Sequence, residues 1–214
     1  MIRETLRVEI TNTRRAHCKP LSKLQRVIFP TLTEDELLTE AMYRKHLDIF
    51  PDGQFAAVAN VHGKALVIGA TSTFRTNFNF DDIKHTFLQA IAGGWLTNHL
   101  PDGEWLYGAD MGIHPHYRGH RVGSRFYETR RELVRRLKLR GEIAGAMLPG
   151  YRGETRKHIS IEDYVHKVAS GDLKDPTLSF QLKNGFRIRG ILYHHYESAT
   201  DPHAVLIVRE NTGL

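Results

Sequence analysis

Trp105-Leu106-Tyr107-Gly108-Ala109-Asp110-Met111-Gly112-Ile113 is the stretch that decides the fold. Large apolar residues alternate with small or polar ones, and a period of two predicts a β-strand. On a regular strand Asp110 would share its face with Gly108 and Gly112, while Tyr107 would lie on the other face. The pattern therefore predicts a carboxylate between two glycines, with room for a ligand beside it.

A loop rich in glycine, proline and charge follows the strand, from His114 to Gly123. From Ser124 onward the apolar residues recur at helical spacing. A strand that leads through a loop into a helix brings unpaired backbone N–H groups and the positive end of the helix dipole to one place, which suits a phosphate. On the loop alone, an ordinary helix start with basic surface residues explains the pattern equally well.

The loop Arg118-Gly119-His120-Arg121-Val122-Gly123 resembles the acetyl-CoA loop of the GNAT N-acetyltransferases. That family has Gln or Arg, two residues, Gly, one residue, and Gly or Ala; here Arg118 takes the first place and Gly123 the last. Arg121 departs from the pattern, since it stands where glycine is usual. Its backbone must tolerate a Cβ, and its guanidinium could reach a phosphate instead.

The resemblance extends over nearly the whole chain. Asn184-Gly185-Phe186 is similar to a second GNAT landmark, in which a helix ends in Gly-Phe before a strand. The segments 105–115 and 175–186 look like one GNAT subgroup found joined to nitrilase-type carbon–nitrogen hydrolases. This chain ends where the acetyltransferase fold ends, so we expect any hydrolase partner to be a separate protein.

The fold class expected is α/β (α+β), a GNAT fold with a mixed central sheet of about seven strands flanked by helices. Strands are predicted at 5–10, 54–61, 64–74, 105–113, 142–148, 186–192 and 204–208, and helices at 21–28, 34–49, 82–92, 124–140, 160–171 and 175–185. Residues 1–214 are expected to form a single domain with insertions at about 75–104 and 149–175. We place the first insertion near the acceptor site, because long loops are often functional.

The composition limits the cellular compartment and the kinds of binding partner that we expect for this protein. The chain is 41% hydrophobic and 25% charged, which is typical of a globular protein, and no segment reads as a membrane span or signal peptide. The single cysteine, Cys18, predicts a reducing cytoplasm and no internal disulfide. A net charge of +6 favours anionic partners. Seven cations on the helix after the loop keep nucleic acid as a rival partner, although the interspersed glutamates favour a solvated helix face.

The resemblance implies which residues hold acetyl-CoA. The strand residues Met111, Gly112 and Ile113 would bind the pantetheine arm and polarise the thioester carbonyl. The loop residues Arg118, Gly119, His120, Arg121, Val122, Gly123 and Ser124 would bind the pyrophosphate through their amides. Three histidines lie near this loop, but no cysteine or carboxylate stands at ligand spacing, so no metal is expected.

Catalytic residues are less well defined. Asp110, Glu104 and Tyr107 lie on or beside the strand where family bases are often found, and a base must take a proton from the amine before it attacks. Asp110 could equally be a structural carboxylate paired with a loop or an arginine. Gln181 occupies the place where many family members have a tyrosine that protonates the departing thiolate. Tyr193, Tyr151 or Tyr196 could supply that acid, or none is needed.

The resemblance implies an N-acetyltransferase that moves an acetyl group from acetyl-CoA to a primary amine of a small molecule or peptide by direct attack. The missing tyrosine keeps an alternative open, in which the fold binds acyl-CoA without turnover and acts as a sensor or partner subunit. A homodimer would be common for the family.

Overall fold

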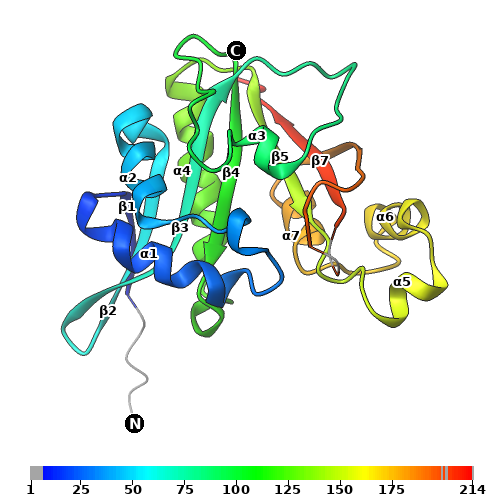
Figure 1. Cartoon of the computed structure of the whole chain (residues 1–214), viewed down its shortest axis with the longest axis horizontal. Coiled ribbons are helices and arrows are strands. Elements are labelled where there is room, and N and C mark those ends of the chain that lie inside the picture. The colour runs from blue at the N-terminus through cyan, green and yellow to red at the C-terminus, as the bar shows by residue number, and fades with distance from the viewer. Residues whose placement is uncertain (1–6, 199, 201, 214) are drawn as a thin grey trace.

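The structure, a computed structural model, describes residues 7–198, 200 and 202–213. Its strands form one sheet in the order β1-β2-β3-β4-β5-β7-β6, and the only parallel neighbours among them are β4 and β5 (Figure 1). The predicted seven-stranded mixed sheet is confirmed. The strands are β1 (Val8–Asn12), β2 (Gln54–Val61), β3 (Lys64–Thr76), β4 (Trp105–Ile113), β5 (Gly141–Met147), β6 (Arg187–Leu192) and β7 (Ala204–Glu210).

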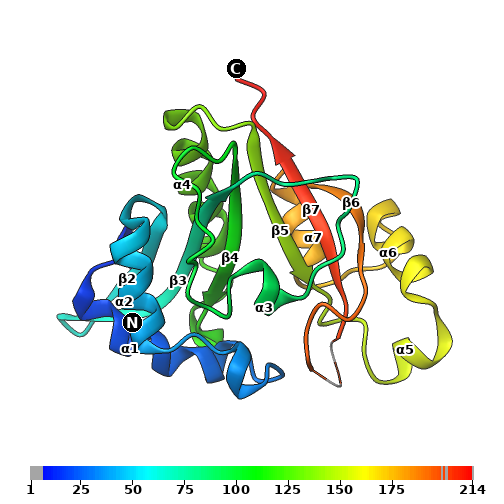
Figure 2. The same ribbon diagram turned by 45° about the horizontal axis from the view of Figure 1, so that its top comes forward.

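Helices cover both faces of this sheet, as Figures 1 and 2 show. One face carries α1 (Arg15–Ile28), α2 (Glu40–Ile49) and the short α3 (Phe87–Ala90). The other face carries α4 (Val122–Arg136) and α7 (Leu178–Lys183), with α5 (Glu154–His158) and α6 (Ile161–Ser170) beyond them. Within the described residues, no helix has both the length and the apolar character needed to cross a membrane.

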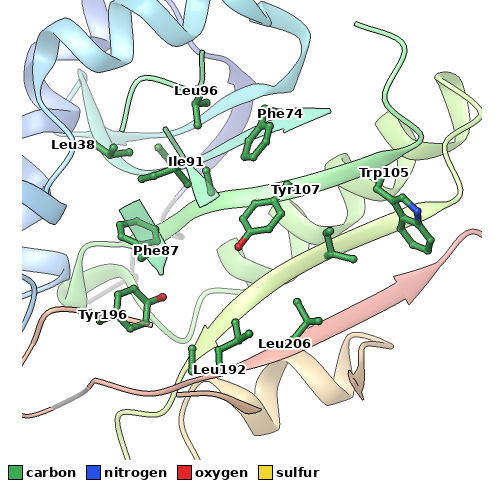
Figure 3. Close-up of a cluster of buried hydrophobic side chains, with 14 of the residues drawn as sticks. Leu38, Phe74, Phe87, Ile91, Leu96, Trp105, Tyr107, Leu192, Tyr196 and Leu206 are labelled. Carbon is green, nitrogen blue, oxygen red and sulfur yellow. The ribbon is translucent and has the colours of Figure 1, made fainter. Parts of the chain in front are cut away.

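Three apolar clusters hold the layers together. The cluster in Figure 3 lies between the sheet and α1 to α3, and it includes Phe87, Ile91 and Leu96 from the segment that joins β3 to β4. On the opposite face, Phe126 of α4 packs against one half of the sheet and Tyr127 against the other half. Because successive residues of a strand point to opposite faces, each central strand contributes to clusters on both sides.

Several predicted boundaries shift in the structure. The expected helix from Glu34 to Ile49 is broken: Thr33 caps only a 3-10 turn over Glu34–Glu36, and Thr39 starts α2. The expected helix at 82–92 is reduced to α3, which Thr86 caps. The short α5 was not predicted, whereas Ser160 and Gly171 bound α6 as expected. The first predicted strand begins outside the described residues.

A β-bulge corrects the predicted faces of β4. Asp110 pairs with Ser72 and Gly108 pairs with Thr73, so Ala109 is an extra residue without a partner on β3. An extra residue reverses the facing of all residues beyond it. Gly108 therefore faces Arg130 of α4, whereas Asp110 and Gly112 face α1 on the other side of the sheet. The prediction that Asp110 shares a face with Gly108 is wrong.

Candidate active site

A cavity of about 840 Å³ runs between the start of α4 and the face of the sheet that carries α1. It is continuous through the gap between β4 and β5, so groups from both faces of the sheet line one space. The lining residues come from β4, β5, the loop before α4, the end of α1 and the start of α7. Those used below are Gln25, Leu38, Phe87, Gly108, Asp110, Met111, Gly112, Ile113, Arg118, Gly119, Arg121, Val122, Gly123, Ser124, Tyr127, Arg130, Ala144, Gly145, Phe180, Gln181 and Tyr196.

The gap exists because β4 and β5 separate partway along their length. They pair in parallel only from Trp105–Gly141 to Gly108–Ala144. Beyond Gly108, β4 continues to Ile113 with β3 as its only partner among the described strands. The opposite edge of this half-strand therefore faces the cavity without a partner strand, and at its end the Ile113 carbonyl accepts from Nε of Arg118 at 3.2 Å. Such an edge can bind the amides of an extended ligand.

The start of α4 supplies a run of free amide groups. The first amide of this region with a backbone acceptor is that of Arg125, which donates to the carbonyl of Arg121 at 3.1 Å. Within the part of the chain that the structure describes, the amides from Gly119 to Ser124 have no hydrogen-bond acceptor. Together with the positive end of the helix dipole, they could hold an anion such as a diphosphate. Of the loop residues predicted to bind the cofactor, only His120 does not line the cavity.

Arg121 adopts the backbone conformation that explains the usual glycine at its position. As the residue before α4 it has φ 60° and ψ 10°, in the left-handed region. A side chain in this region costs about 1–2 kcal/mol because Cβ approaches the following carbonyl. The chain accepts this strain and carries an exposed guanidinium at the mouth of the cavity.

Gly123 serves a packing role in addition to its place in the loop. A Cβ at Gly123 would lie 2.9 Å from the ring of Phe180 in α7. The absence of a side chain therefore lets α4 and α7 approach closely. Asp175 secures the start of α7, since its Oδ1 accepts from the amides of Thr177 and Leu178, each at 2.8 Å.

Asp110 lies at the other end of the cavity, within a network from three elements. Its Oδ2 accepts from Nε2 of Gln25 in α1 at 3.0 Å and from the hydroxyl of Tyr43 in α2 at 3.0 Å. Gln25 also donates to the Tyr43 hydroxyl at 2.6 Å, and the Thr71 hydroxyl donates to the Asp110 carbonyl at 2.8 Å. These bonds hold the bulge and the carboxylate in one orientation.

The environment of Asp110 suits proton transfer near neutral pH. Burial raises the pKa of this carboxyl to about 6, although the hydrogen bonds from Tyr43 and Gln25 oppose the rise. A carboxylate with this pKa is ionised at pH 7 and is a stronger base than an ordinary aspartate. The pKa of Tyr43 lies well above its usual value, because of burial and the adjacent Asp110 charge. Tyr43 therefore remains a hydrogen-bond donor to the carboxylate.

Comparison with known proteins identifies the family. No family model matches the chain. The probable hydrolase YhcX of Bacillus subtilis is 40% identical over 146 residues, which cover 68% of this chain but only 28% of YhcX. The uncharacterized N-acetyltransferase YkwB of the same organism is 33% identical over 177 residues, 82% of this chain and 76% of YkwB. This chain belongs to the GNAT N-acetyltransferases.

Solved structures share the GNAT fold. The GNAT-like decarboxylase GphF, in complex with isobutyryl-CoA, superposes with a TM-score of 0.78 at 23% identity, covering 95% of this chain and 99% of that chain. The loading GNAT-like domain of CurA from Lyngbya majuscula has the same TM-score at 17% identity, covering 97% and 100%. At these identities the similarity concerns the fold. Relatives and neighbours together support a GNAT-family acyltransferase.

The other predicted catalytic residues of this GNAT chain lie outside the cavity lining. Glu104 precedes β4 and forms an ion pair with Arg140 at 3.2 Å, with both side chains exposed. Tyr107 is buried and its hydroxyl contacts Nε2 of His85 at 3.1 Å. Tyr193 is 53% exposed and bonds to Glu162. The structure does not bring these three together with Asp110.

Tyr196 is the tyrosine among the suggested acids that reaches the cavity. It is buried, and burial raises the pKa of its hydroxyl far above the usual value. Tyr151 instead donates to the carbonyl of Ile159 at 3.1 Å. Gln181 lines the cavity beside Tyr127, in the place where the family often has tyrosine. Gln25 and Tyr43 were missed, since nothing in their local sequence indicates contact with Asp110.

The geometry gives little support to a metal site or to a nucleic-acid surface along α4. In the described ranges, no group of three or more His, Cys, Asp and Glu side chains could hold a metal ion. Cys18 is buried, and burial raises the pKa of its thiol. Most cations of the α4 region bind groups of this chain: Arg125 with Val8, Arg130 with Glu142, Arg131 with Asn184, Arg136 with Asp52 and Arg140 with Glu104.

Proposed function

We propose that this chain is a CoA-dependent N-acyltransferase that uses acetyl-CoA and a primary amine. One observation carries the proposal: a single cavity connects the free amides at the start of α4 with the Asp110 carboxylate, through the gap between β4 and β5. A diphosphate at one end and a reacting amine at the other would lie on opposite faces of the sheet. The molecule that must span this distance is long, thin and anionic at one end, as CoA esters are.

Different residues would bind the diphosphate, bind the pantetheine arm and transfer the proton. The amides of residues 119 to 124, with Arg118 and Arg121, would bind the diphosphate. The edge of Met111 to Ile113, which has no partner strand on this side among those described, would bind the pantetheine amides and polarise the thioester carbonyl. Asp110 would take a proton from the ammonium group, directly or through one water, so that the free amine attacks the thioester. The C–N bond then forms as the C–S bond breaks. The nitrogen releases its extra proton to solvent, and the thiolate takes up a proton from Tyr196 or from solvent.

The acceptor is proposed to be a small molecule or a peptide N-terminus. The inner wall of the cavity near Asp110 includes Phe87 and Leu38. The segment 75–104 lies on the side of the sheet that carries α1, and the segment 149–175 lies beside α7. An apolar wall beside the Asp110 carboxylate favours an amine with an apolar neighbour. A separate hydrolase partner and a homodimer are further proposals, and both rest on the family resemblance.

The decisive experiment measures binding and turnover separately. Acetyl-CoA should raise the melting temperature by mass action. Release of free CoA thiol should then be screened across amino acids, polyamines, aminoglycosides and peptide N-termini. An unchanged melt at millimolar acetyl-CoA would contradict the proposal. Binding of acetyl-CoA without release of CoA thiol in the presence of any of these amines would favour the acyl-CoA-binding module instead.

A further inference from the structure

The closed end of the β4–β5 gap contains a buried arginine. Arg130 projects from α4 and is 1% exposed, and its Nη2 lies directly against Gly108, where any Cβ would clash with it. Arg130 lines the same cavity as Asp110, together with Gly108, Ala144 and Gly145. These small residues are at the point where the two strands come together. The cavity therefore ends beside a guanidinium group.

The charge around Arg130 is not balanced. Its Nε donates to Oε2 of Glu142 at 2.9 Å, and the other oxygen of Glu142 is paired with Arg209. Glu142 is 1% exposed and Arg209 is 8% exposed, so all three groups are buried. Two guanidinium groups thus share one carboxylate. Burial lowers the pKa of Arg209 to about 10, and repulsion from Arg130 acts in the same direction against the attraction of Glu142.

Arg130 also has an unused donor. Among the described residues, Nη2 of Arg130 has no hydrogen-bond partner. A buried N–H group without an acceptor is destabilising, and more so when it is charged. A small anion at this end of the cavity would satisfy the donor and neutralise the cluster. A carboxylate matches the planar geometry of a guanidinium.

We propose that this end of the cavity binds acyl groups that end in a carboxylate, so that the chain takes a short dicarboxylic acyl-CoA more tightly than a neutral acyl-CoA of the same shape. The inference rests on the CoA site proposed above and extends the range of donors beyond acetyl. The recognition element is Nη2 of Arg130, which the missing side chain of Gly108 allows to lie against β4. The three-carbon malonyl group is the shortest such acyl group that has a carbon atom between the thioester carbonyl and the carboxylate.

The test compares two esters that differ in charge but not in skeleton. Malonyl-CoA and isovaleryl-CoA carry acyl groups with the same arrangement of heavy atoms, and acetyl-CoA serves as the reference. Isothermal titration at one fixed salt concentration should show malonyl-CoA binding about tenfold tighter than isovaleryl-CoA, the factor expected for one charge-assisted hydrogen bond. Arg130→Met should remove this preference and leave the affinity for acetyl-CoA within about twofold. The variant keeps the Glu142–Arg209 pair, so no buried carboxylate is left alone.

Arg131→Met is the matched control, because it removes the same charge from the next residue, which lies outside this cavity and donates to Asn184. Its preference for malonyl-CoA should equal that of the wild type. Arg130→Lys keeps the charge without the planar fork and should retain only part of the preference. Equal affinity of the wild type for the two esters, or a preference that survives Arg130→Met, would overturn the inference alone. Failure to bind any CoA ester would overturn it together with the proposed function.

Discussion

The side-chain amide of Gln25 donates to the carboxylate of Asp110 at 3.0 Å, although the two residues are 85 positions apart in the chain. This bond joins α1 to the bulge in β4. It keeps the carboxylate of Asp110 directed at the face of the sheet that carries α1, at the inner end of the cavity. The position of the proposed base therefore depends on how a helix packs on the sheet.

The role of Asp110 as base can be tested by its pH dependence. Because the carboxyl must be ionised to accept a proton, kcat/KM should fall about tenfold per pH unit below about pH 6, the pKa of Asp110. Asp110→Asn should lower kcat by about 10²- to 10⁴-fold and leave acetyl-CoA affinity unchanged. Glu104→Gln, which changes an exposed carboxylate before β4, is the control and should not affect kcat. A full rate for Asp110→Asn would remove Asp110 from the mechanism.

Tyr43 should set the pH at which kcat/KM begins to fall in acid, the acidic limb of the profile. Its hydroxyl donates to the Asp110 carboxylate and opposes the effect of burial on the pKa of that group. Tyr43→Phe should therefore move the limb of the kcat/KM profile to higher pH while the plateau rate changes little. Tyr151→Phe removes a buried tyrosine hydroxyl that bonds to a carbonyl elsewhere, and its profile should match the wild type. An unmoved limb in Tyr43→Phe would show that another group titrates.

Replacing Arg121 with glycine should raise the stability of the protein and lower its affinity for acetyl-CoA. Arg121→Gly relieves a left-handed backbone and should raise the free energy of unfolding by about 0.5–1 kcal/mol. The same change removes a guanidinium at the mouth of the cavity and should weaken acetyl-CoA binding several-fold. Arg121→Ala retains the strain and loses the charge, so it should weaken binding equally without the gain in stability. Equal unfolding free energies for the two variants would contradict this explanation.

Two buried histidines should make stability fall in acid. Burial lowers the pKa of His46 and of His195 to about 4, below the usual value of 6.5. The unfolded chain takes up protons on these residues as pH falls from about 6.5, whereas the folded chain does not until about pH 4. The free energy of unfolding should therefore decrease over this window by at most about 1.4 kcal/mol per pH unit for each residue. Asp110 acts in the opposite sense, because its pKa is raised.

Denaturant titrations at several pH values would measure the histidine effect. His46→Gln retains a donor for the Gly94 carbonyl, which His46 contacts at 2.7 Å, and should flatten the decrease. His166→Gln changes an exposed histidine of α6 and should leave the slope as it is. The same slope in both variants would exclude His46 as a source of acid sensitivity.

The local parts of this protein could be predicted from the sequence. Period-two alternation predicted the strands, helical spacing predicted α4, and the free amides at its start follow from how any helix begins. These features depend on neighbouring residues, so a single chain shows them. The anion site at residues 118–124 and the family resemblance rest on the same local patterns.

Only the tertiary structure decided what faces the cavity. The bulge at Ala109 depends on pairing with β3, and it moves Asp110 to the opposite face from Gly108. Gln25 meets Asp110, and Arg130 meets Glu142, because helices from distant parts of the chain pack on the same strands. A one-residue change of register reverses every side chain beyond it, and long-range contacts leave no periodic signal. The sequence thus determined the free amides at the start of α4, and packing determined which side chains share the cavity with them.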